Sequence, residues 1–196
     1  TTYNLAEIVE ENSHIVFEAQ AFVQALQPML PRFYSIASSQ LENPDEVDLT
    51  VARVSYSIEG RERRGICSHF LCDLAPLNQA CVPLYLQSSK DFRVPVDDQK
   101  KIIMIGPGTG IAPFRAFMQE RVCRKAPGAN WLFFGERYRN NDFFYGQYWN
   151  DLVTQGCLRL DVAFSRDQDE KIYVQDIMKK QSCDLWQWLQ EGAVIY

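Results

Sequence analysis

The spacing of apolar residues changes partway along the chain and predicts two kinds of structure in its first half. Phe22, Leu26 and Leu30 lie four positions apart, which favours helical structure over residues 1–30. Pro31 follows directly, and a proline ends a helix because it lacks the backbone donor. We therefore expect the chain to begin with helix and to change its structure at this proline.

Short stretches with strand character follow that proline. They are residues 32–38, 48–58 and 82–87, with a turn at Pro44 and Asp45 between the first two. In the first stretch Arg32 and Tyr34 alternate, so both side chains point to one side of the expected strand. A cation beside an aromatic ring suits a flat, negatively charged ligand, and an edge strand with a surface tyrosine is the alternative. Gly65 opens a short helix between the second and third stretches.

The second half of the chain alternates between buried strands and helices. Strands are expected at residues 101–106, 130–135, 158–165 and 193–196. The helix after the first strand carries apolar residues at spacings of three and four, namely Phe114, Phe117, Met118 and Val122. Strands that alternate with helices predict a parallel sheet with right-handed crossovers. The polar stretch 88–101 is predicted to be a linker that precedes this sheet.

Composition and charge narrow the classes of function. The chain has 196 residues, a net charge of −5 and no apolar run near the roughly 20 residues of a membrane span. The acidic balance argues against nonspecific nucleic-acid binding, and the first residues lack the apolar segment of a secretory leader. The six cysteines form no C-x-x-C pair and only two histidines are present, so no metal site is expected. We interpret the cysteines as free thiols of a cytoplasmic protein.

A glycine-rich loop after the strand at 101–106 carries the first candidate chemistry. Gly106, Gly108 and Gly110 lie in the stretch "IGPGTGIAPF" and leave no side chain in the way of a phosphate. Backbone N–H groups and the start of the following helix supply partial positive charge. Tight turns alone explain many glycine triplets, but a strand before the loop and a helix after it favour phosphate binding.

Cations and hydroxyls gather after the strand at 158–165. The group consists of Ser165, Arg166, Lys171, Tyr173 and Gln175. The carboxyl end of a parallel strand is where open α/β sheets bind ligands. The cations suit the additional phosphate that distinguishes NADP from NAD, and the tyrosine ring could stack on a base. A solvated polar loop is the alternative, because the same stretch contains Asp167, Asp169 and Glu170.

Four motifs together resemble the ferredoxin–NADP reductase family, and within it the diflavin reductases. They are "RFYSIASS", "RRGICSHFL", "IGPGTGIAPFRAFMQER" and "AFSRDQDEKIYVQD", in the family's order. The resemblance implies an incomplete FAD-binding β-barrel followed by an NADP-binding α/β domain with a parallel sheet. It places the end of a helical connecting region at residues 1–30, the partial barrel at 31–98, and the NADP-binding domain, without its C-terminal segment, at 99–196. The chain is thus expected to be part of a longer protein.

The resemblance also implies roles for individual residues. Arg32 would meet the FAD pyrophosphate, Tyr34 would stack on the isoalloxazine, and Ser35 would be the catalytic residue, hydrogen-bonded near the reactive nitrogen. The other implied FAD-binding residues are Phe33, Thr50, Val51 and Ala52 near the flavin, Tyr56 at the adenine, and Gly65, Ile66, Cys67 and Ser68 around the pyrophosphate. The implied NADP(H)-binding residues are Gly106, Gly108, Thr109 and Gly110, followed by Ser165, Arg166, Lys171, Ile172, Tyr173, Val174 and Gln175.

The activity implied by the resemblance is hydride transfer from NADPH to FAD, with electrons passed on through FMN to an acceptor protein. FMN belongs to a flavodoxin-like domain that is absent from this chain. The stretches "APGANWLFFG", "DFFYGQYW" and "SRDQDEKIYVQD" are similar to the sulfite reductase branch of the family, which implies a sulfite reductase hemoprotein as the acceptor. The alternatives are a single-flavin ferredoxin or flavodoxin reductase and a nonenzymatic NADP-binding fragment.

Overall fold

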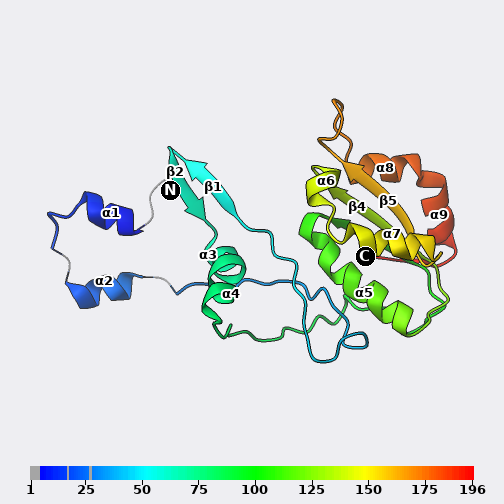
Figure 1. Cartoon of the computed structure of the whole chain (residues 1–196), viewed down its shortest axis with the longest axis horizontal. Helices are drawn as coiled ribbons and strands as arrows, with labels where there is room; N and C mark the ends of the chain where they lie inside the picture. Colours follow the sequence, from blue (N-terminus) through cyan, green and yellow to red (C-terminus); the bar gives the residue numbers. More distant parts are fainter. Residues whose placement is uncertain (1–4, 17, 27) are drawn as a thin grey trace. The chain divides into compact units, whose positions relative to one another are not determined.

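The structure consists of two units, and each unit is built from two separate stretches of the chain (Figure 1). Unit 1 comprises residues 1–33 and 52–82, and unit 2 comprises residues 34–51 and 83–196. The computed structural model describes residues 5–16, 18–26 and 28–196. The boundary between the units falls within the predicted flavin-binding strand, between Phe33 and Tyr34.

Parallel strands form the sheet of unit 2 in the order β5-β4-β3-β6. They are β3 (Ile102–Pro107), β4 (Asn130–Glu136), β5 (Arg159–Phe164) and β6 (Val194–Ile195). The chain runs outward from β3 through β4 to β5 and then returns to place β6 on the other side of β3. This reversal is a topological switch point, and open α/β sheets bind ligands outside the carboxyl ends of the strands there. The parallel sheet confirms the predicted class for the second half of the chain.

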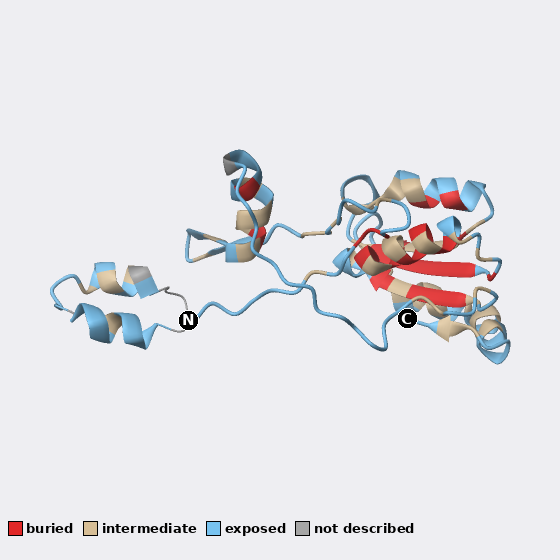
Figure 2. Cartoon of the chain, turned by 90° about the horizontal axis from the view of Figure 1, so that it is seen from below, coloured by how far each residue is buried: buried red, intermediate tan, exposed pale blue. Residues whose placement is uncertain are grey.

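Each face of this sheet is covered by a different pair of helices. The helical elements of unit 2 are the 3-10 turn η2 (Gly108–Ile111), α5 (Ala112–Cys123), α6 (Arg139–Asp142), α7 (Gly146–Thr154), α8 (Val174–Lys180) and α9 (Ser182–Gln190). Ile102 and Met104 pack with α5 and α7, whereas Ile103 packs with α8 and α9. Figure 2 shows the two central strands, β3 and β4, drawn largely as buried residues, whereas most of β5 is intermediate. Burial of each such side chain contributes about 1.5–3 kcal/mol, so both faces of the sheet stabilise unit 2.

Two of the predicted strands do not form among the described residues. Residues 32–38 contain only an isolated bridge between Ile36 and Leu49, and residues 82–87 pair with no backbone in the described part of the chain. A strand needs a neighbour to exchange its backbone hydrogen bonds, and beyond that bridge neither stretch has one in the described ranges. Leu86 is accordingly 75% exposed.

Unit 1 combines a β-hairpin with a helical stretch and short N-terminal helices. Its elements are α1 (Leu5–Glu11), α2 (Ala19–Ala25), β1 (Ser55–Ile58), β2 (Arg61–Arg64), α3 (Ile66–His69), the π-helical η1 (Phe70–Leu74) and α4 (Ala75–Asn78). β1 and β2 pair antiparallel through Glu59 and Gly60, whose φ angles are +50° and +77°. Positive φ at both positions matches the type I′ turn of a two-residue hairpin. Of the strand predicted over 48–58, only the last part forms, and its antiparallel pairing agrees with the class predicted for the FAD-binding half.

The N-terminal helices differ from the apolar helical face expected over residues 1–30. Helix α2 buries none of its residues, and Leu26 and Leu30 are 44% and 73% exposed. Helices of seven residues are too short to be stable in isolation, so contacts must hold them. In α1, both carboxylate oxygens of Glu7 accept hydrogen bonds from the Arg63 guanidinium at 2.6 Å. The helical stretch expected over residues 1–30 also includes residues 1–4, 17 and 27, which lie outside the described ranges.

Candidate functional site

The predicted phosphate-binding loop forms a tight turn at the carboxyl end of β3. A Cβ on Gly106 would lie 2.8 Å from Cδ2 of Phe114 and 3.0 Å from the carbonyl oxygen of Gly110, so only glycine fits there. Gly108 has a φ of +57°, which favours glycine for conformational reasons. Thr109 is exposed at the tip, and the chain continues through η2 into α5. The local sequence therefore makes the chain turn sharply between strand and helix.

The outer side of this turn is open. Beyond its chain neighbours, a Cβ on Gly110 would meet only Cδ of Pro107, at 4.0 Å. Among the described residues, a Cβ on Gly108 would meet only Oε1 of Glu136, at 3.8 Å. The other oxygen of that carboxylate accepts a hydrogen bond from Arg137 N at 2.6 Å and lies 3.8 Å from Nε of the same arginine. Among the described residues no side chain caps η2, so the N–H groups of Gly108 and Thr109 at its start are available to a ligand. The first residues of α5 offer none, because Ala112 N donates to the Thr109 carbonyl oxygen and Pro113 has no N–H. An open cradle of backbone amides fits a pyrophosphate group.

The backbone after β5 is hydrogen-bonded to the end of β4, and the side chains of the predicted cations on this loop lie on the surface. Ser165 N donates to the carbonyl oxygen of Glu136, and Arg166 N donates to that of Arg137, both at 2.9 Å. The Ser165 hydroxyl also donates to the Glu136 carbonyl, at 3.3 Å. Arg166 and Lys171 are exposed, and neither side chain forms an ion pair with any residue that the structure describes. Unpaired cations on one loop fit an anionic group such as a phosphate monoester.

The same loop leads into α8. Tyr173 is 45% exposed, and its N–H donates to Oδ2 of Asp176 at 2.9 Å, which fixes the start of the helix. Val174, the first residue of α8, instead packs against the sheet. A Cβ on Gly135 would lie only 2.4 Å from its Cγ2. Val174 thus supports the loop, while the Tyr173 ring is exposed for stacking. Gln175 is exposed as well.

A pocket of about 290 Å³ lies beside this loop, at the end of β5 and next to α6 and α8. It is lined by Arg139, Val162, Ala163, Phe164, Asp167, Gln168, Ile172 and Ile177. The guanidinium carbon of Arg139 lies 4.7 Å from the centroid of the Phe164 ring, a cation–π contact that holds it in the pocket wall. Sequence reasoning identified Ile172 but missed Arg139 and Gln168. The basic stretch "GERYR" after β4 is the signal that points to Arg139.

The predicted FAD-binding residues are divided between the two units. Those in unit 1 are Arg32, Phe33, Ala52, Tyr56, Gly65, Ile66, Cys67 and Ser68. Arg32 is exposed and donates from Nη1 to the carbonyl oxygen of Leu30 at 2.9 Å. Phe33 and Tyr56 are 66% and 52% exposed. Tyr56, on β1, thus presents a ring face on which an adenine can stack.

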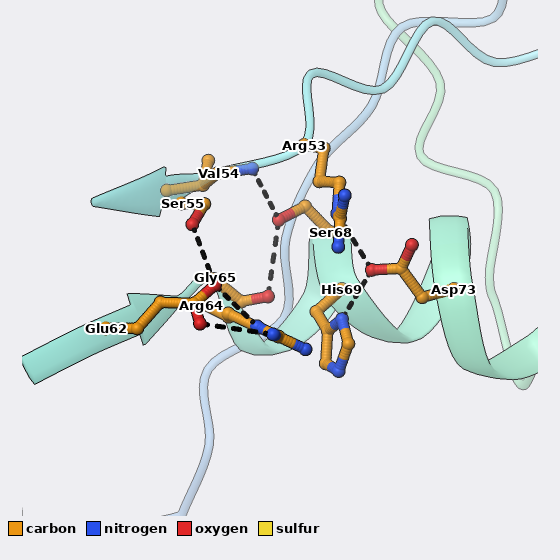
Figure 3. A network of polar contacts seen from close by, with 9 residues as sticks. All are labelled: Arg53, Val54, Ser55, Glu62, Arg64, Gly65, Ser68, His69 and Asp73. Atoms are coloured by element: carbon orange, nitrogen blue, oxygen red, sulfur yellow. Dashed lines mark hydrogen bonds and ion pairs between the residues drawn. The ribbon is translucent and has the colours of Figure 1, made fainter. Parts of the chain in front are cut away.

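The predicted pyrophosphate-binding turn joins β2 to α3 and is fastened to the residue before β1 (Figure 3). Gly65 N donates to the carbonyl oxygen of Val54 at 2.9 Å. The Ser68 hydroxyl accepts from Val54 N and donates to the Gly65 carbonyl, both at 3.2 Å, so this hydroxyl organises the turn. A Cβ on Gly65 would lie only 2.7 Å from the same hydroxyl. No side chain among the described residues caps α3, which leaves the N–H groups of Ile66 and Cys67 for a pyrophosphate.

Sequence reasoning missed a charged network beside this turn. His69 Nδ1 and Asp73 Oδ2 lie 2.5 Å apart, and Arg53 Nε lies 2.9 Å from the same oxygen (Figure 3). The hydrogen bond with His69 lowers the pKa of the Asp73 carboxyl below its usual range, and the charge of Arg53 acts in the same direction. A histidine and an aspartate four positions apart on an expected helix were the available signal.

Unit 2 holds the remaining predicted flavin residues, namely Tyr34, Ser35, Thr50 and Val51. Ser35 is exposed, and the other three are half-buried. The Thr50 hydroxyl lies 2.6 Å from the hydroxyl of Tyr145, which precedes α7. The segment that carries these residues is therefore hydrogen-bonded to the residue that precedes α7, in the part of unit 2 that holds the parallel sheet.

Comparison with known protein families assigns both halves of the chain. Residues 1–70 match the family model of the FAD binding domain, and residues 104–196 match that of the oxidoreductase NAD-binding domain. The chain therefore combines a match to a FAD binding domain with a match to an oxidoreductase NAD-binding domain, as the resemblance to the ferredoxin–NADP reductase family implies. An antiparallel FAD-binding part followed by a parallel nucleotide-binding sheet is the fold class predicted from the four motifs, and it is confirmed. The FAD-binding and NAD-binding matches agree with the open turns at Gly65 and Gly108.

The relatives described here share about half of the residues of this chain. The sulfite reductase [NADPH] flavoprotein alpha-component of Escherichia coli O1:K1 is 49% identical over 180 residues, or 91% of this chain and 30% of that protein. The proteins of the same name from Citrobacter koseri and Shigella dysenteriae are 51% and 49% identical, again over 91% of this chain and 30% of each protein. The chain thus spans 30% of the length of these relatives.

Metal-binding clusters and membrane helices are absent from the part of the chain that the structure describes. Across residues 5–16, 18–26 and 28–196, no three or more His, Cys, Asp or Glu side chains gather to hold a metal ion. In the same ranges no helix has the length and apolar character needed to cross a membrane. All six cysteines are free.

Proposed function

We propose that the chain is the FAD- and NADP(H)-binding reductase module of a diflavin reductase, an NADPH-dependent flavoprotein oxidoreductase. The proposal is carried by one observation. The open glycine turn after β3 and the unpaired cations after β5 lie at the same edge of the parallel sheet. Only β4 separates the two strands, which places them roughly 10 Å apart. A dinucleotide with its pyrophosphate on the glycine turn can therefore direct a 2′-phosphate toward Arg166 and Lys171.

The chain's own residues bind and orient the two cofactors. When bound, the cofactors supply the redox chemistry, in which a hydride passes from NADPH to FAD. The backbone amides of the turn at Gly108 and Gly110 hold the NADP(H) pyrophosphate, and the Tyr173 ring stacks near the 2′-phosphate end. Arg32 binds the FAD pyrophosphate. Ser35 is the catalytic residue that we place beside the reactive edge of the flavin, as a hydrogen-bonding group.

The domain organisation follows the same proposal. We assign residues 1–30 to the end of a helical connecting region, residues 31–98 to the FAD-binding part and residues 99–196 to the NADP-binding domain. The sheet of unit 2 lies wholly within the last of these ranges, which supports the assignment. The segment 34–51, which carries proposed flavin contacts, belongs to the same unit as that sheet and is hydrogen-bonded to α5. This supports a module that brings two cofactors together.

For the electron acceptor we propose a sulfite reductase hemoprotein, reached through an FMN-binding, flavodoxin-like domain outside this chain. The support is the name of the relatives that are 49% and 51% identical to it. We place the protein in the cytoplasm, because six free cysteines suit a reducing compartment.

The test of the proposed function is nucleotide choice in an Arg166→Ala variant, measured by titration calorimetry of the chain with NADP+ and with NAD+. A hydrogen bond to a charged group contributes about 1.5–3 kcal/mol, so NADP+ should bind about 10- to 100-fold more weakly. NAD+ lacks the 2′-phosphate and should bind nearly unchanged. Lys180→Ala, which removes a cation from the last turn of α8, is the matched control. Equal losses for both nucleotides would contradict the assignment and indicate a structural role for Arg166.

A further inference from the structure

Arg115 joins helix α5 to a segment that lies 67 residues earlier in the chain. Its Nη1 donates to Oδ2 of Asp48 at 2.6 Å and to the carbonyl oxygen of Ala37 at 2.8 Å. The Arg115 side chain is 19% exposed and Ala37 is fully buried, so the bond between them is screened less by water than a bond at the surface. The Asp48 side chain is 46% exposed, so the ion pair with it is partly solvated. All three residues belong to unit 2.

Ala37 and Asp48 lie on the two ends of one loop, called here the flavin arms (residues 34–38 and 48–51). Ala37 N donates to the carbonyl oxygen of Asp48 at 2.8 Å, and Asp48 N donates to the Ser38 hydroxyl at 2.8 Å. The isolated antiparallel bridge of this unit pairs the same two arms. The arms are therefore bonded to each other, and a single guanidinium holds both of them.

Further contacts fasten this loop to the nucleotide-binding half of unit 2. One turn further along α5, the buried Gln119 side chain accepts a hydrogen bond from Ser39 N at 2.8 Å. Tyr145 bonds to Thr50 through its hydroxyl at 2.6 Å, and its ring centroid lies 4.8 Å from the guanidinium carbon of Arg115. Arg115 thus contacts both arms and also the tyrosine that holds the end of the second arm.

The position of Arg115 links the two candidate binding regions. Ala37 follows Ser35 by two residues and Asp48 precedes Thr50 by two, and Ser35 and Thr50 are both proposed flavin contacts. Helix α5, which carries Arg115 in its first turn, begins directly after the glycine turn. We propose that Arg115 is a positioning residue, which fixes the flavin arms relative to the nucleotide turn and so sets the approach of the two cofactors. This inference rests on the proposed function.

Among the contacts that hold the flavin arms to the rest of unit 2, those of Arg115 are the strongest. Gln119 and Tyr145 each contribute one hydrogen bond between neutral groups, whereas Arg115 contributes a charged pair and a second bond from the same nitrogen. A displacement of about 1 Å between reacting groups can cost on the order of 100-fold in rate. A residue that holds the arms therefore acts on the reaction step while it leaves the nucleotide-binding groups in place.

The first test uses the 196-residue chain without any cofactor. In Arg115→Gln, loss of a charged hydrogen bond should speed amide exchange at Ala37 and Asp48 by roughly tenfold or more, while Met104 in the sheet keeps its rate. Arg124→Gln, at the other end of α5, is the matched control. Unchanged exchange in the arms would overturn the proposal. Equal acceleration in the sheet would also overturn it, because it would indicate general destabilisation.

The second test measures reduction by NADPH in the natural full-length protein loaded with FAD. Arg115→Gln should lower kcat by about 10- to 100-fold, while the KM for NADPH stays nearly constant. Arg115→Lys keeps a charge and a donor and should restore part of kcat. A higher KM with unchanged kcat would overturn the positioning role. Failure of the unaltered chain to bind NADP+ in calorimetry would refute the proposed function, and the exchange test would still decide whether Arg115 holds the arms.

Discussion

Gly106 and Phe114 lie in direct contact, and this contact sets the path of the chain from β3 into α5. A Cβ on Gly106 would lie 2.8 Å from Cδ2 and 2.9 Å from Cε2 of the phenyl ring. Phe114 is 2% exposed and belongs to the larger apolar cluster of unit 2, so its ring has little room to move away. Packing from the inside therefore holds the nucleotide turn in place.

Gly106→Ala should lower the free energy of unfolding of unit 2 by about 1–3 kcal/mol, because the added methyl group overpacks the contact with the ring. Urea unfolding followed by the fluorescence of Trp131 and Trp149, both in the core of this unit, measures the loss. A loss below about 0.5 kcal/mol would show that the turn or the ring moves aside at little cost.

Gly110→Ala should weaken NADP+ binding and leave the free energy of unfolding nearly unchanged. Its Cβ would enter open space, so the free energy of unfolding should change by less than about 0.5 kcal/mol. The methyl group would occupy the cradle in which we place the pyrophosphate, and NADP+ should bind about tenfold more weakly in calorimetry. Gly106→Ala is the comparison variant for stability. Unchanged NADP+ affinity in Gly110→Ala would place the pyrophosphate elsewhere.

Arg121 should be a major contributor to the stability of unit 2. The side chain is 1% exposed, burial lowers the pKa of its guanidinium, and Nε donates to Oδ1 of Asn130 at 2.6 Å. Nη2 donates to the carbonyl oxygens of Gly128 and Lys100, at 2.7 Å and 3.0 Å. Arg121→Met leaves these acceptors unpaired, at a cost of about 3 kcal/mol or more in urea unfolding. Arg124→Met, whose ion pairs lie nearer the surface, should cost about 1 kcal/mol or less, and equal losses would argue against the role of burial.

Asp73 should make the stability of unit 1 depend on pH in the acid range. Its pKa in the folded protein lies below the usual range because of the hydrogen bond with His69. Such a carboxyl stabilises the fold above its ordinary pKa of about 3.9 and loses this contribution as the pH falls through the folded-state value. Asp73→Asn should therefore be less stable than the unaltered chain at about pH 6 and approach it in stability at about pH 3. Urea unfolding followed by circular dichroism tests this, and a difference that persists undiminished in acid would contradict it.

Local patterns were enough to predict the strand, glycine turn and helix that we propose bind the nucleotide. A strand buried on both faces needs a continuous apolar run, and the turn after β3 needs glycine at Gly106 for space and at Gly108 for its positive φ. The helix that begins after Gly65 and the exposed cations Arg166 and Lys171 were predicted for similar reasons, since each depends on the residue type and its immediate neighbours.

Long-range pairing could not be predicted from the same patterns. Periodicity shows which side chains are buried but not what they are buried against, so the strand order β5-β4-β3-β6 and the bonds of Arg115 and Arg121 emerged only from the fold. The predicted strands at 32–38 and 82–87 failed for the same reason, because a strand forms only where another backbone lies alongside it. The hydrogen bond from Arg115 to Asp48 depends on the path of the whole intervening chain, and no local feature of either residue encodes that path.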